Sequence, residues 1–303
     1  MPPMCSGPSL KKMSSINERF ELGKPLARYS TYQIGGPADF FFEAKTKGEA
    51  VEALNWASEH DLPYFVFGGG SNLLFDDEGF HGLVIKMSAN EIRVEGERVY
   101  AEAGAKAGAL VKAAQEASLS GLEAWNGLPG TVGGAVFGNA GCFGVESKDV
   151  LGDAELWLPG EGLKKVGLEF FDYEYRNSKL KKEGGVVLAA TFKLQKAERS
   201  EIDKKMKEIA LLRVQKQPPG LSTGSFFKNP PGDKSAGWLI EQCGLKEAMV
   251  GKAQVSKFHA NFFMNKGGAT AEDVLGLAEK VKAEVKQRFG IELEQEVIYL
   301  QSS

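Results

Sequence analysis

Two glycine-rich segments constrain this chain more strongly than any other feature of its sequence. Residues 68–72 read Gly-Gly-Gly-Ser-Asn and follow the apolar run 63–67, which we predict to be a buried strand. Residues 127–141 form a second, longer glycine-rich segment. Backbone without Cβ atoms can approach a ligand closely and adopt positive φ, and successive exposed N–H groups can then bind an anion. Two such loops in one chain favour a diphosphate-containing ligand, whereas one loop alone would favour a plain turn.

Length and composition limit the classes of protein to which the chain can belong. A chain of 303 residues with 43% hydrophobic content suits two or three domains. The net charge of -3 provides no general basic surface, so we expect no binding to nucleic acid or to anionic membranes. No apolar run approaches the length needed to span a membrane.

The cysteines and histidines are few and scattered. Cys5, Cys142 and Cys243 form no CxxC pair, so they indicate neither a zinc site nor a disulfide framework. Their odd and sparse number fits a reducing cytoplasm, which is where we expect the protein to act. Because the sequence has only three histidines, we also expect no metal centre.

Hydrophobic periodicity and turn signals divide the chain into four stretches. These are a disordered tail (1–15), a β-α-β unit with the first glycine loop (16–87), a strand-rich region (88–197) and a C-terminal α+β region (198–303). The C-terminal region contains predicted helices at about 200–215 and 271–289, followed by a predicted strand at 291–300. Gly290 is expected to end the longer helix.

Two short segments have residue types suited to chemistry on an anionic ligand. Arg176, in the run Tyr-Arg-Asn-Ser, offers a planar bidentate fork to a carboxylate. Ser225 lies between a glycine and two aromatic residues, which can build a water-poor wall where its hydroxyl could donate a proton. The sequence has no GxSxG elbow and no obvious His-Asp pair beside Ser225, so the pattern argues against a serine hydrolase.

Charged and polar side chains near the C-terminus add further candidates. Glu292, Glu294 and Glu296 alternate along the last predicted strand and are therefore expected to share one face. Such a face is most often simply solvated, but one of these carboxyls could act as an acid if the face covers a pocket. His259 is a lone histidine between polar residues, which leaves both a structural role and a ligand contact open.

Taken together and in order, these segments resemble the family of UDP-N-acetylenolpyruvoylglucosamine reductases. The resemblance spans about residues 24–300, and each segment alone is weak, but their ordered set is specific. The matching segments are residues 29–31, 34–38, 68–74, 127–135, 138–141, 175–178, 216–218, 224–230, 236–240 and 296–297.

The resemblance implies an α+β fold and a reductive activity. Its FAD-binding part would be of the vanillyl-alcohol-oxidase/PCMH type, with two subdomains, followed by a C-terminal α+β substrate domain. FAD would be bound without a covalent link, and NADPH would supply the electrons. The implied reaction converts UDP-N-acetylglucosamine enolpyruvate to UDP-N-acetylmuramate for peptidoglycan synthesis. We expect a monomer.

Roles for individual residues also follow from the resemblance. Arg176 is implied to polarise the enolpyruvyl carboxylate, Ser225 to donate the proton and Glu296 to act with the arginine, with Glu294 as the alternative carboxyl. Substrate contacts are implied for Lys216, Asn229 and His259. The implied cofactor-binding residues are Tyr29, Ser30, Thr31, Gly68, Gly69, Gly70, Ser71, Asn72, Gly127, Pro129, Gly130, Thr131, Gly133, Gly134, Gly138, Asn139 and Gly141.

The chain departs from the family pattern at two places. Cys142 and Phe143 stand where the family commonly has Ala-Tyr, which alters a polar contact near the flavin. No tyrosine lies between Arg176 and Ser225, which places the chain in a shorter subtype without the extra tyrosine loop.

Two other functions fit the glycine loops. One is a flavin oxidase of the same broad fold acting on another alcohol or acid, and the other is a flavin or nucleotide-sugar binding module without turnover. The segment 224–230 and the trio Arg176, Ser225 and Glu296 favour the reductase.

Overall fold

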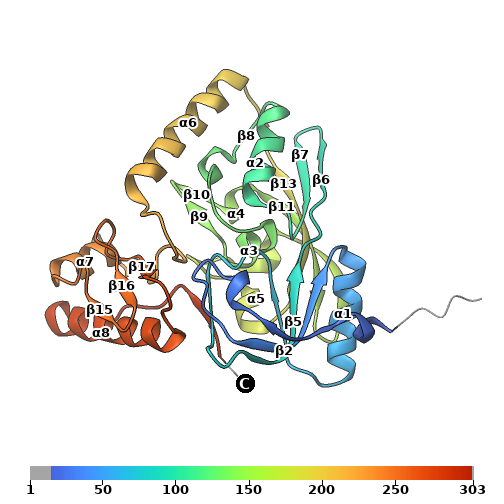
Figure 1. Ribbon diagram of the computed structural model, residues 1–303. Coiled ribbons are helices and arrows are strands. Elements are labelled where there is room, and N and C mark those ends of the chain that lie inside the picture. Colours follow the sequence, from blue (N-terminus) through green and yellow to red (C-terminus); the bar gives the residue numbers. More distant parts are fainter. Residues whose placement is uncertain (1–14, 302–303) are drawn as a thin grey trace, which may run out of the picture.

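A mixed β-sheet forms the first part of the molecule, whose computed structural model describes residues 15–301. Its strands lie in the order β1 (Glu21–Pro25), β2 (Pro37–Ala44), β5 (Phe80–Met87) and β3 (Tyr64–Phe67). Strand β1 is antiparallel to β2, whereas β2, β5 and β3 run parallel. Helix α1 (Lys47–Glu59) links β2 to β3, as the sequence predicts for a β-α-β unit (Figure 1).

A second sheet of five antiparallel strands forms the middle of the molecule. Its order is β12 (Gly162–Gly167), β11 (Leu151–Leu158), β13 (Val186–Lys193), β7 (Arg98–Glu102) and β6 (Ile92–Glu95). The predicted hairpin between β6 and β7 is present, with Val94 opposite Val99. Helices α2 (Ala107–Glu116) and α3 (Val132–Phe137) pack beside this sheet.

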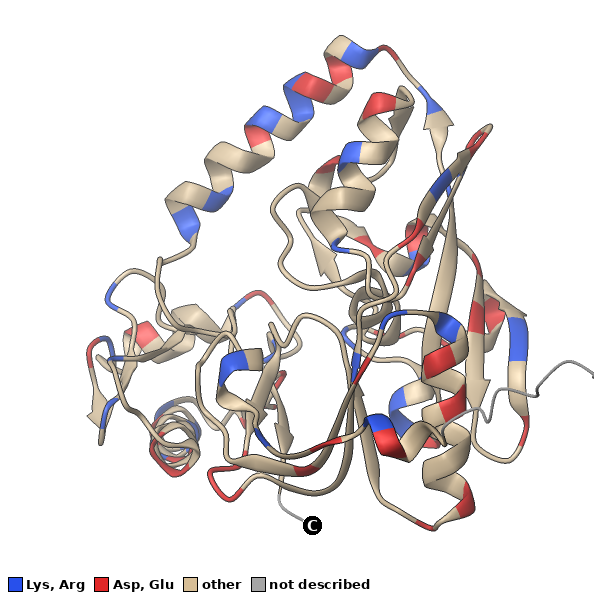
Figure 2. Ribbon diagram, turned by 45° about the vertical axis from the view of Figure 1, so that its right-hand side comes forward, with Lys and Arg blue, Asp and Glu red and all other residues tan. Residues whose placement is uncertain are grey.

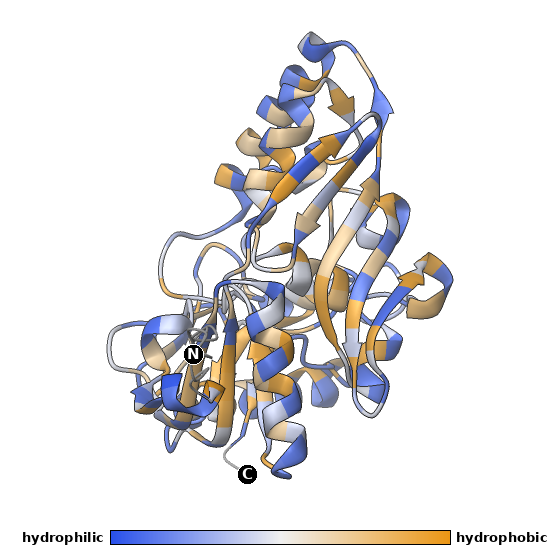
Figure 3. Cartoon of the chain, turned by 90° about the vertical axis from the view of Figure 1, so that its right-hand side faces the viewer, coloured by the Kyte–Doolittle hydropathy of each residue, from blue (hydrophilic) through white to orange (hydrophobic). Residues whose placement is uncertain are grey.

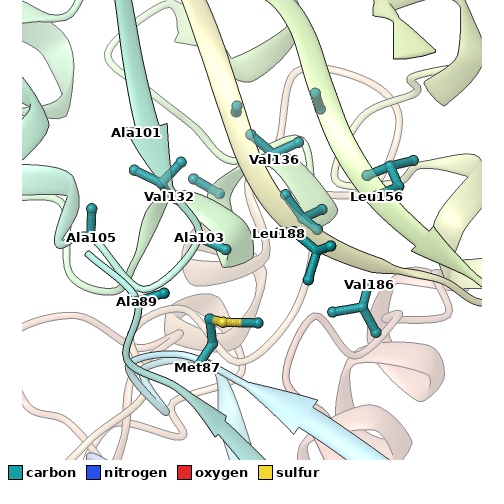
Figure 4. Packing of buried hydrophobic residues seen from close by; sticks show 14 of the residues in the cluster. Met87, Ala89, Ala101, Ala103, Ala105, Val132, Val136, Leu156, Val186 and Leu188 are labelled. Carbon is teal, nitrogen blue, oxygen red and sulfur yellow. The ribbon is translucent and has the colours of Figure 1, made fainter. Parts of the chain in front are cut away.

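One hydrophobic core joins the two sheets. Met87 at the end of β5 belongs to the same buried cluster as Leu188 in β13, Val132 in α3 and Ala103 (Figure 4). Figure 3 shows the hydrophobic residues running along the strands. Because the core is continuous, the loops at the junction of the two sheets are held in fixed positions relative to one another.

Short elements complete the first two parts. They are η1 (Ile16–Arg19), η2 (Ala27–Tyr29), β4 (Leu73–Phe75), β8 (Leu119–Ser120), η3 (Glu123–Trp125), β9 (Gly141–Cys142), β10 (Val145–Glu146), α4 (Ser147–Val150), η4 (Leu168–Phe171), α5 (Lys179–Glu183) and β14 (Gln195–Lys196).

The C-terminal part is a smaller α+β unit reached through the long helix α6 (Arg199–Lys216). Its other elements are α7 (Ala236–Gln242), β15 (Met249–Val250), β16 (Ala253–Val255), β17 (Phe263–Asn265) and α8 (Ala271–Phe289). Helix α8 has the predicted bounds, and Gly290 ends it in the left-handed conformation at φ 68°. The Asp77 carboxylate accepts hydrogen bonds from the backbone N–H of Ala271 at 2.8 Å, which ties α8 to the first part of the chain.

Helix α6 is less amphipathic than the sequence predicts from its apolar residues Ile202, Met206, Ile209, Ala210 and Val214. Ile202 is the one fully buried member of that set, whereas Val214 is 82% exposed. Charged residues cover much of the helix (Figure 2). The other buried side chain of α6 is the charged Arg213, so the helix docks partly through polar contacts.

The predicted strand at 291–300 is wrong over most of its length. Only β18 (Ile298–Leu300) is a strand, and it pairs in parallel with β4. The preceding residues instead follow the segment 226–228: Lys228 N–H donates to Glu294 O, and Glu296 N–H donates to Phe226 O, both at 2.8 Å. The chain therefore changes partners within this stretch, which alternation of side chains cannot reveal.

The domain boundaries at residues 87 and 197 stay a prediction. Strand β18 lies beyond the second boundary, yet it pairs with β4 of the first part. The predicted tail lies outside the described residues except for Ser15. In the range 15–301, no helix is long and apolar enough to cross a membrane.

Candidate active site

The two glycine loops pack directly against each other. A Cβ atom at Gly68 would overlap the Thr131 side chain, and one at Gly69 would lie 3.0 Å from the Cα of Gly130. Gly130 itself has φ +101°, and a Cβ there would lie 2.7 Å from Ser71 Oγ. Glycine is therefore required on both sides of this junction, because side chains would separate the loops.

The segment 29–31 closes a third side of this junction. Gly70 has φ +63°, and a Cβ atom there would overlap the carbonyl oxygen of Tyr29. Thr31 N–H donates to Gly70 O at 3.2 Å. The hydroxyl groups of Thr31 and Thr131 are both buried without a hydrogen-bond partner among residues 15–301. Such orphaned hydroxyls beside glycine backbone fit a ligand rich in acceptor oxygens, such as the diphosphate of FAD.

Substituting Gly70 with alanine is expected to remove bound flavin. The control is Gly96→Ala, because Gly96 has nearly the same φ of +64° but no heavy atom within 4 Å of its hypothetical Cβ. The control should cost about 1 kcal/mol of folding free energy from φ alone. Gly70→Ala should melt at a lower temperature than this control and lose its 450 nm absorbance. Equal flavin content and equal melting temperatures in the two variants would contradict a flavin-binding role for the junction of the glycine loops.

Arg176 lies in a strained turn. Glu174 and Asn177 exchange two backbone hydrogen bonds of 3.2 Å, which close the turn around Tyr175 and Arg176. Arg176 has φ +56°, a left-handed conformation that favours glycine. Strain of this kind costs about 1–3 kcal/mol and is concentrated at functional sites. The turn places the Arg176 guanidinium beside Glu296 as an ion pair, with Nε 3.2 Å from Oε1, but within residues 15–301 the Nε–H makes no hydrogen bond.

The three glutamates of the last segment have different environments. Glu292 and Glu294 are 75% and 71% exposed and pair with Lys286 and Lys228, whereas the side chain of Glu296 is 18% exposed. The prediction that the three glutamates share one face of a strand is therefore wrong, because residues 292–296 do not form a strand. The structure brings Glu296, not Glu294, to Arg176.

Glu296 sits in a cluster dominated by positive charge. Burial raises the pKa of its carboxyl, while the charges of Arg176, Lys181 and Lys228 act in the opposite direction. The net pKa of Glu296 is above its ordinary value, because the cost of burying the charged form outweighs the three cations. The shift favours the protonated carboxyl, which can donate a hydrogen bond, up to a higher pH than in an ordinary glutamate.

Ser225 precedes Phe226, the residue whose backbone contacts Glu296. Its neighbour Phe226 accepts a hydrogen bond from Glu296 N–H at 2.8 Å and donates to Asn261 O at 2.7 Å. The backbone of Ser225 forms an isolated antiparallel β-bridge with Phe262. Phe226 stacks on Phe263 with the ring centres 4.5 Å apart, and both rings are buried in the core of the C-terminal part, so an apolar wall beside the Ser225 hydroxyl stays a prediction.

Asn72 connects the first glycine loop to this cluster. Its side-chain amide donates to Glu296 O at 3.1 Å, and its own carbonyl oxygen accepts from Ile298 N–H at 3.0 Å. Arg176 also lines an open hollow of about 510 Å³ with residues 141–146, Lys148, Asp149 and Tyr175. The glycine junction and the Arg176–Glu296 pair thus belong to one connected site.

Two protein-family models match the chain. Residues 38–167 match the FAD binding domain, and residues 216–300 match the C-terminal domain of UDP-N-acetylenolpyruvoylglucosamine reductase. The reductase of Rubrobacter xylanophilus is 42% identical over 277 residues, which cover 90% of this chain and 93% of that protein. The chain belongs to the UDP-N-acetylenolpyruvoylglucosamine reductase family.

Further relatives agree with this assignment. The UDP-N-acetylenolpyruvoylglucosamine reductase of Chloroflexus aggregans is 40% identical over 283 residues, covering 90% of this chain and 95% of that protein. The crystal structure of the reductase from Thermus caldophilus has a TM-score of 0.81 at 37% identity, covering 93% of this chain and 99% of that one. These similarities confirm the predicted family, the two-subdomain FAD-binding fold and FAD as the cofactor.

Some residues expected to bind cofactor hold the site together through their side chains. Ser30 Oγ donates to Leu73 O at 3.2 Å and accepts from Tyr32 N–H at 3.1 Å. Tyr29 stacks on Phe41 with the ring centres 4.7 Å apart. If Ser30 and Tyr29 contact FAD as predicted, they would do so through backbone atoms or through the exposed edge of the Tyr29 ring.

The second glycine segment is also partly structural in this member of the reductase family. Asn139 is fully buried, donates to Glu146 and to Glu174 O, and accepts from Lys148 N–H. A Cβ atom at Gly133 would lie 2.7 Å from the Cβ of Ala103. Gly127, Pro129, Gly134, Gly138 and Gly141 lie along the same segment between η3 and β10. Direct contact of these residues with FAD stays a prediction.

The residues expected to bind substrate make contacts with groups other than the Arg176–Glu296 pair. Asn229 Oδ1 accepts from Ala236 N–H at 3.1 Å, at the start of α7. His259 Nδ1 accepts from Asn261 N–H at 3.2 Å, and burial lowers its pKa, so a neutral ring is favoured. Lys216 is exposed at the end of α6. Within residues 15–301, no hydrogen bond or ion pair joins these three side chains to the pair.

Sequence reasoning missed four residues around this family site. Lys181 and Lys228 surround Glu296, Asn261 holds the backbone of Phe227 on both sides, and Arg213 donates to Asn126 O at 2.6 Å. Lys228 and Asn261 occurred within segments already singled out, whereas nothing in the local sequence distinguishes Lys181 from its neighbouring lysines.

Arg213 contacts Cys142 and Phe143, the two residues that differ from the family pattern. Its guanidinium donates to Cys142 Sγ at 3.2 Å and lies 5.1 Å from the centre of the Phe143 ring. Arg213 of α6 therefore contacts both residues at which the chain departs from the family pattern. The assignment to the shorter subtype stays a prediction.

Proposed function

We propose that this chain uses NADPH and bound FAD to reduce UDP-N-acetylglucosamine enolpyruvate to UDP-N-acetylmuramate, acting as a monomer in the cytoplasm. The observation that carries the proposal is the half-buried Arg176–Glu296 pair, which is joined to the backbone of Phe226 next to Ser225 and to the first glycine loop through Asn72. Its residue types match the implied roles of the reductase family, and its surroundings favour an anionic ligand.

The two glycine loops and the hydroxyls of Thr31 and Thr131 would hold FAD, which would supply a hydride for the methylene carbon of the enol ether when reduced. The protein must then stabilise the negative charge that develops beside the substrate carboxylate. The Arg176 guanidinium offers two donors to that carboxylate, and a protonated Glu296 can add a third hydrogen bond. Low exposure of both groups strengthens these contacts, since water does not screen them.

Ser225 completes the reaction by giving its hydroxyl proton to the carbon next to the carboxylate. Its backbone is anchored through its neighbour Phe226, whose carbonyl oxygen accepts a hydrogen bond from Glu296 N–H. Lys216 remains the best placed of the three proposed substrate contacts, because its side chain is exposed, whereas Asn229 and His259 have protein partners.

The decisive experiment measures the visible spectrum and then NADPH oxidation with and without UDP-N-acetylglucosamine enolpyruvate. The proposal expects a flavin spectrum and oxidation that depends on the substrate. Rapid oxygen consumption with an alcohol or acid substrate would favour the oxidase alternative instead. A yellow protein without turnover would favour the binding module, and a colourless protein unable to take up FAD would overturn the proposal. Mass measurement in solution tests the monomer.

A further inference from the structure

The strained turn of Arg176 receives one additional contact from outside itself. Lys181, in α5, donates from Nζ to the carbonyl oxygen of Arg176 at 2.7 Å. This bond fixes the peptide that follows Arg176, at the residue whose φ is +56°. Because an unfavoured backbone conformation persists only when surrounding contacts determine it, the Lys181 bond has a direct bearing on where the guanidinium points.

Lys181 differs from the other lysines of the same helix. Lys179 pairs with Glu183 at 3.4 Å near the surface, and Lys182 is exposed. Burial lowers the pKa of Lys181, and the like charges of Lys228 and Arg176 lower it further, while Glu296 and Glu294 oppose this. Placing an ammonium group among other cations costs free energy. The hydrogen bond from Lys181 to the Arg176 carbonyl oxygen offsets part of this cost.

The local charges leave room for an anion. Arg176, Lys181 and Lys228 all act on Glu296, while Lys228 is also paired with the exposed Glu294. The single carboxyl of Glu296 does not balance the remaining positive charge of Arg176 and Lys181. A substrate carboxylate would restore the balance, because it would bring the missing negative charge to the Arg176 guanidinium.

We propose that Lys181 is a positioning residue of the active site. Its ammonium group holds the Arg176 carbonyl and thereby keeps the Arg176 guanidinium aligned with Glu296 for the substrate carboxylate. Lys181 acts through Arg176 and does not itself touch the reacting atoms. The inference rests on the proposed reductase function, and it assigns a role to a residue that the sequence did not single out.

The test separates the two half-reactions of the flavoprotein in Lys181→Met, which removes the donor but keeps the length of the side chain. Reduction of the flavin by NADPH, followed anaerobically at 450 nm, is expected to keep its wild-type rate. Reoxidation of the reduced flavin by UDP-N-acetylglucosamine enolpyruvate is expected to slow about 100-fold, as for a misplaced catalytic group. Lys181→Arg, which keeps a charged donor, should recover part of this loss.

Lys182→Met is the matched control, since Lys182 is the exposed neighbour on α5. It should leave both half-reactions unchanged. If Lys181→Met loses its flavin, Lys181→Gln, which keeps a neutral donor, decides the question by the same two rates. The Lys181 role is overturned if both half-reactions slow equally, or if reoxidation keeps its wild-type rate. Absence of substrate-dependent reoxidation in the wild-type protein would instead refute the reductase function itself.

Discussion

Replacing Ser225 with alanine is expected to lower kcat by about 1,000-fold, within the range observed for loss of a general acid. The hydroxyl is the only group for which the proposed mechanism requires proton donation to carbon. Ser225 makes its backbone bridge to Phe262, and this contact does not depend on the side chain. The variant should therefore keep its fold, its flavin spectrum and its rate of reduction by NADPH. Stopped-flow reoxidation with the enolpyruvyl substrate measures the loss.

Ser222→Ala provides a control in the same loop. Ser222 Oγ accepts from Gly224 N–H at 3.1 Å, so this change weakens a local turn without removing the proposed acid. The control should retain kcat within a few-fold. A Ser225→Ala variant that turns over at a similar rate to Ser222→Ala would exclude Ser225 as the proton donor. Water or Glu296 would then be the candidate donors.

Glu296→Ala is expected to lower kcat by about 100- to 1,000-fold, as for removal of one donor that stabilises developing negative charge. Glu296→Gln should be less damaging, because its amide keeps a hydrogen-bond donor in a similar position. The exposed Glu294 supplies the comparison, and Glu294→Gln should leave kcat nearly unchanged. Equal losses in Glu294→Gln and Glu296→Gln would contradict the assignment of the charge-stabilising carboxyl to Glu296.

The pH profile tests the same carboxyl with a defined sign. Burial raises the pKa of Glu296 above its ordinary value, against the lowering effects of Arg176, Lys181 and Lys228. If the protonated form stabilises the reaction, kcat falls as the pH rises through this pKa. Glu296→Gln cannot ionise, so its reoxidation rate should lose this descending limb. Persistence of the same limb in Glu296→Gln would assign it to another group.

Features with a local physical cause could be predicted from the sequence. Helix α8 has the predicted bounds because Thr270 caps its start and Gly290 can adopt the left-handed conformation at its end. The glycine loops were predicted to bind a ligand because close backbone approach is a property of the residue type. The trio Arg176, Ser225 and Glu296 followed from an ordered family resemblance.

Features that depend on distant partners could not be predicted in this way. The stretch before β18 reads as a strand, but it pairs first with the segment 226–228 and then with β4. That change of partner separates Glu296 from Glu292 and Glu294 in exposure, although all three occupy similar positions in the sequence. Lys181 is one of several lysines in a charged run, and only the fold directs it to Arg176.

Asn72 and Glu296 lie 224 positions apart in the chain but share a hydrogen bond. Strand β18, which follows directly, completes the pairing of β4. During synthesis, the first glycine loop leaves the ribosome long before the residues that fix it. The nascent polypeptide must therefore wait for residue 300 before this part of the active site can assemble, and an enzyme truncated ahead of β18 should emerge without a finished flavin pocket even though its glycine loops are intact.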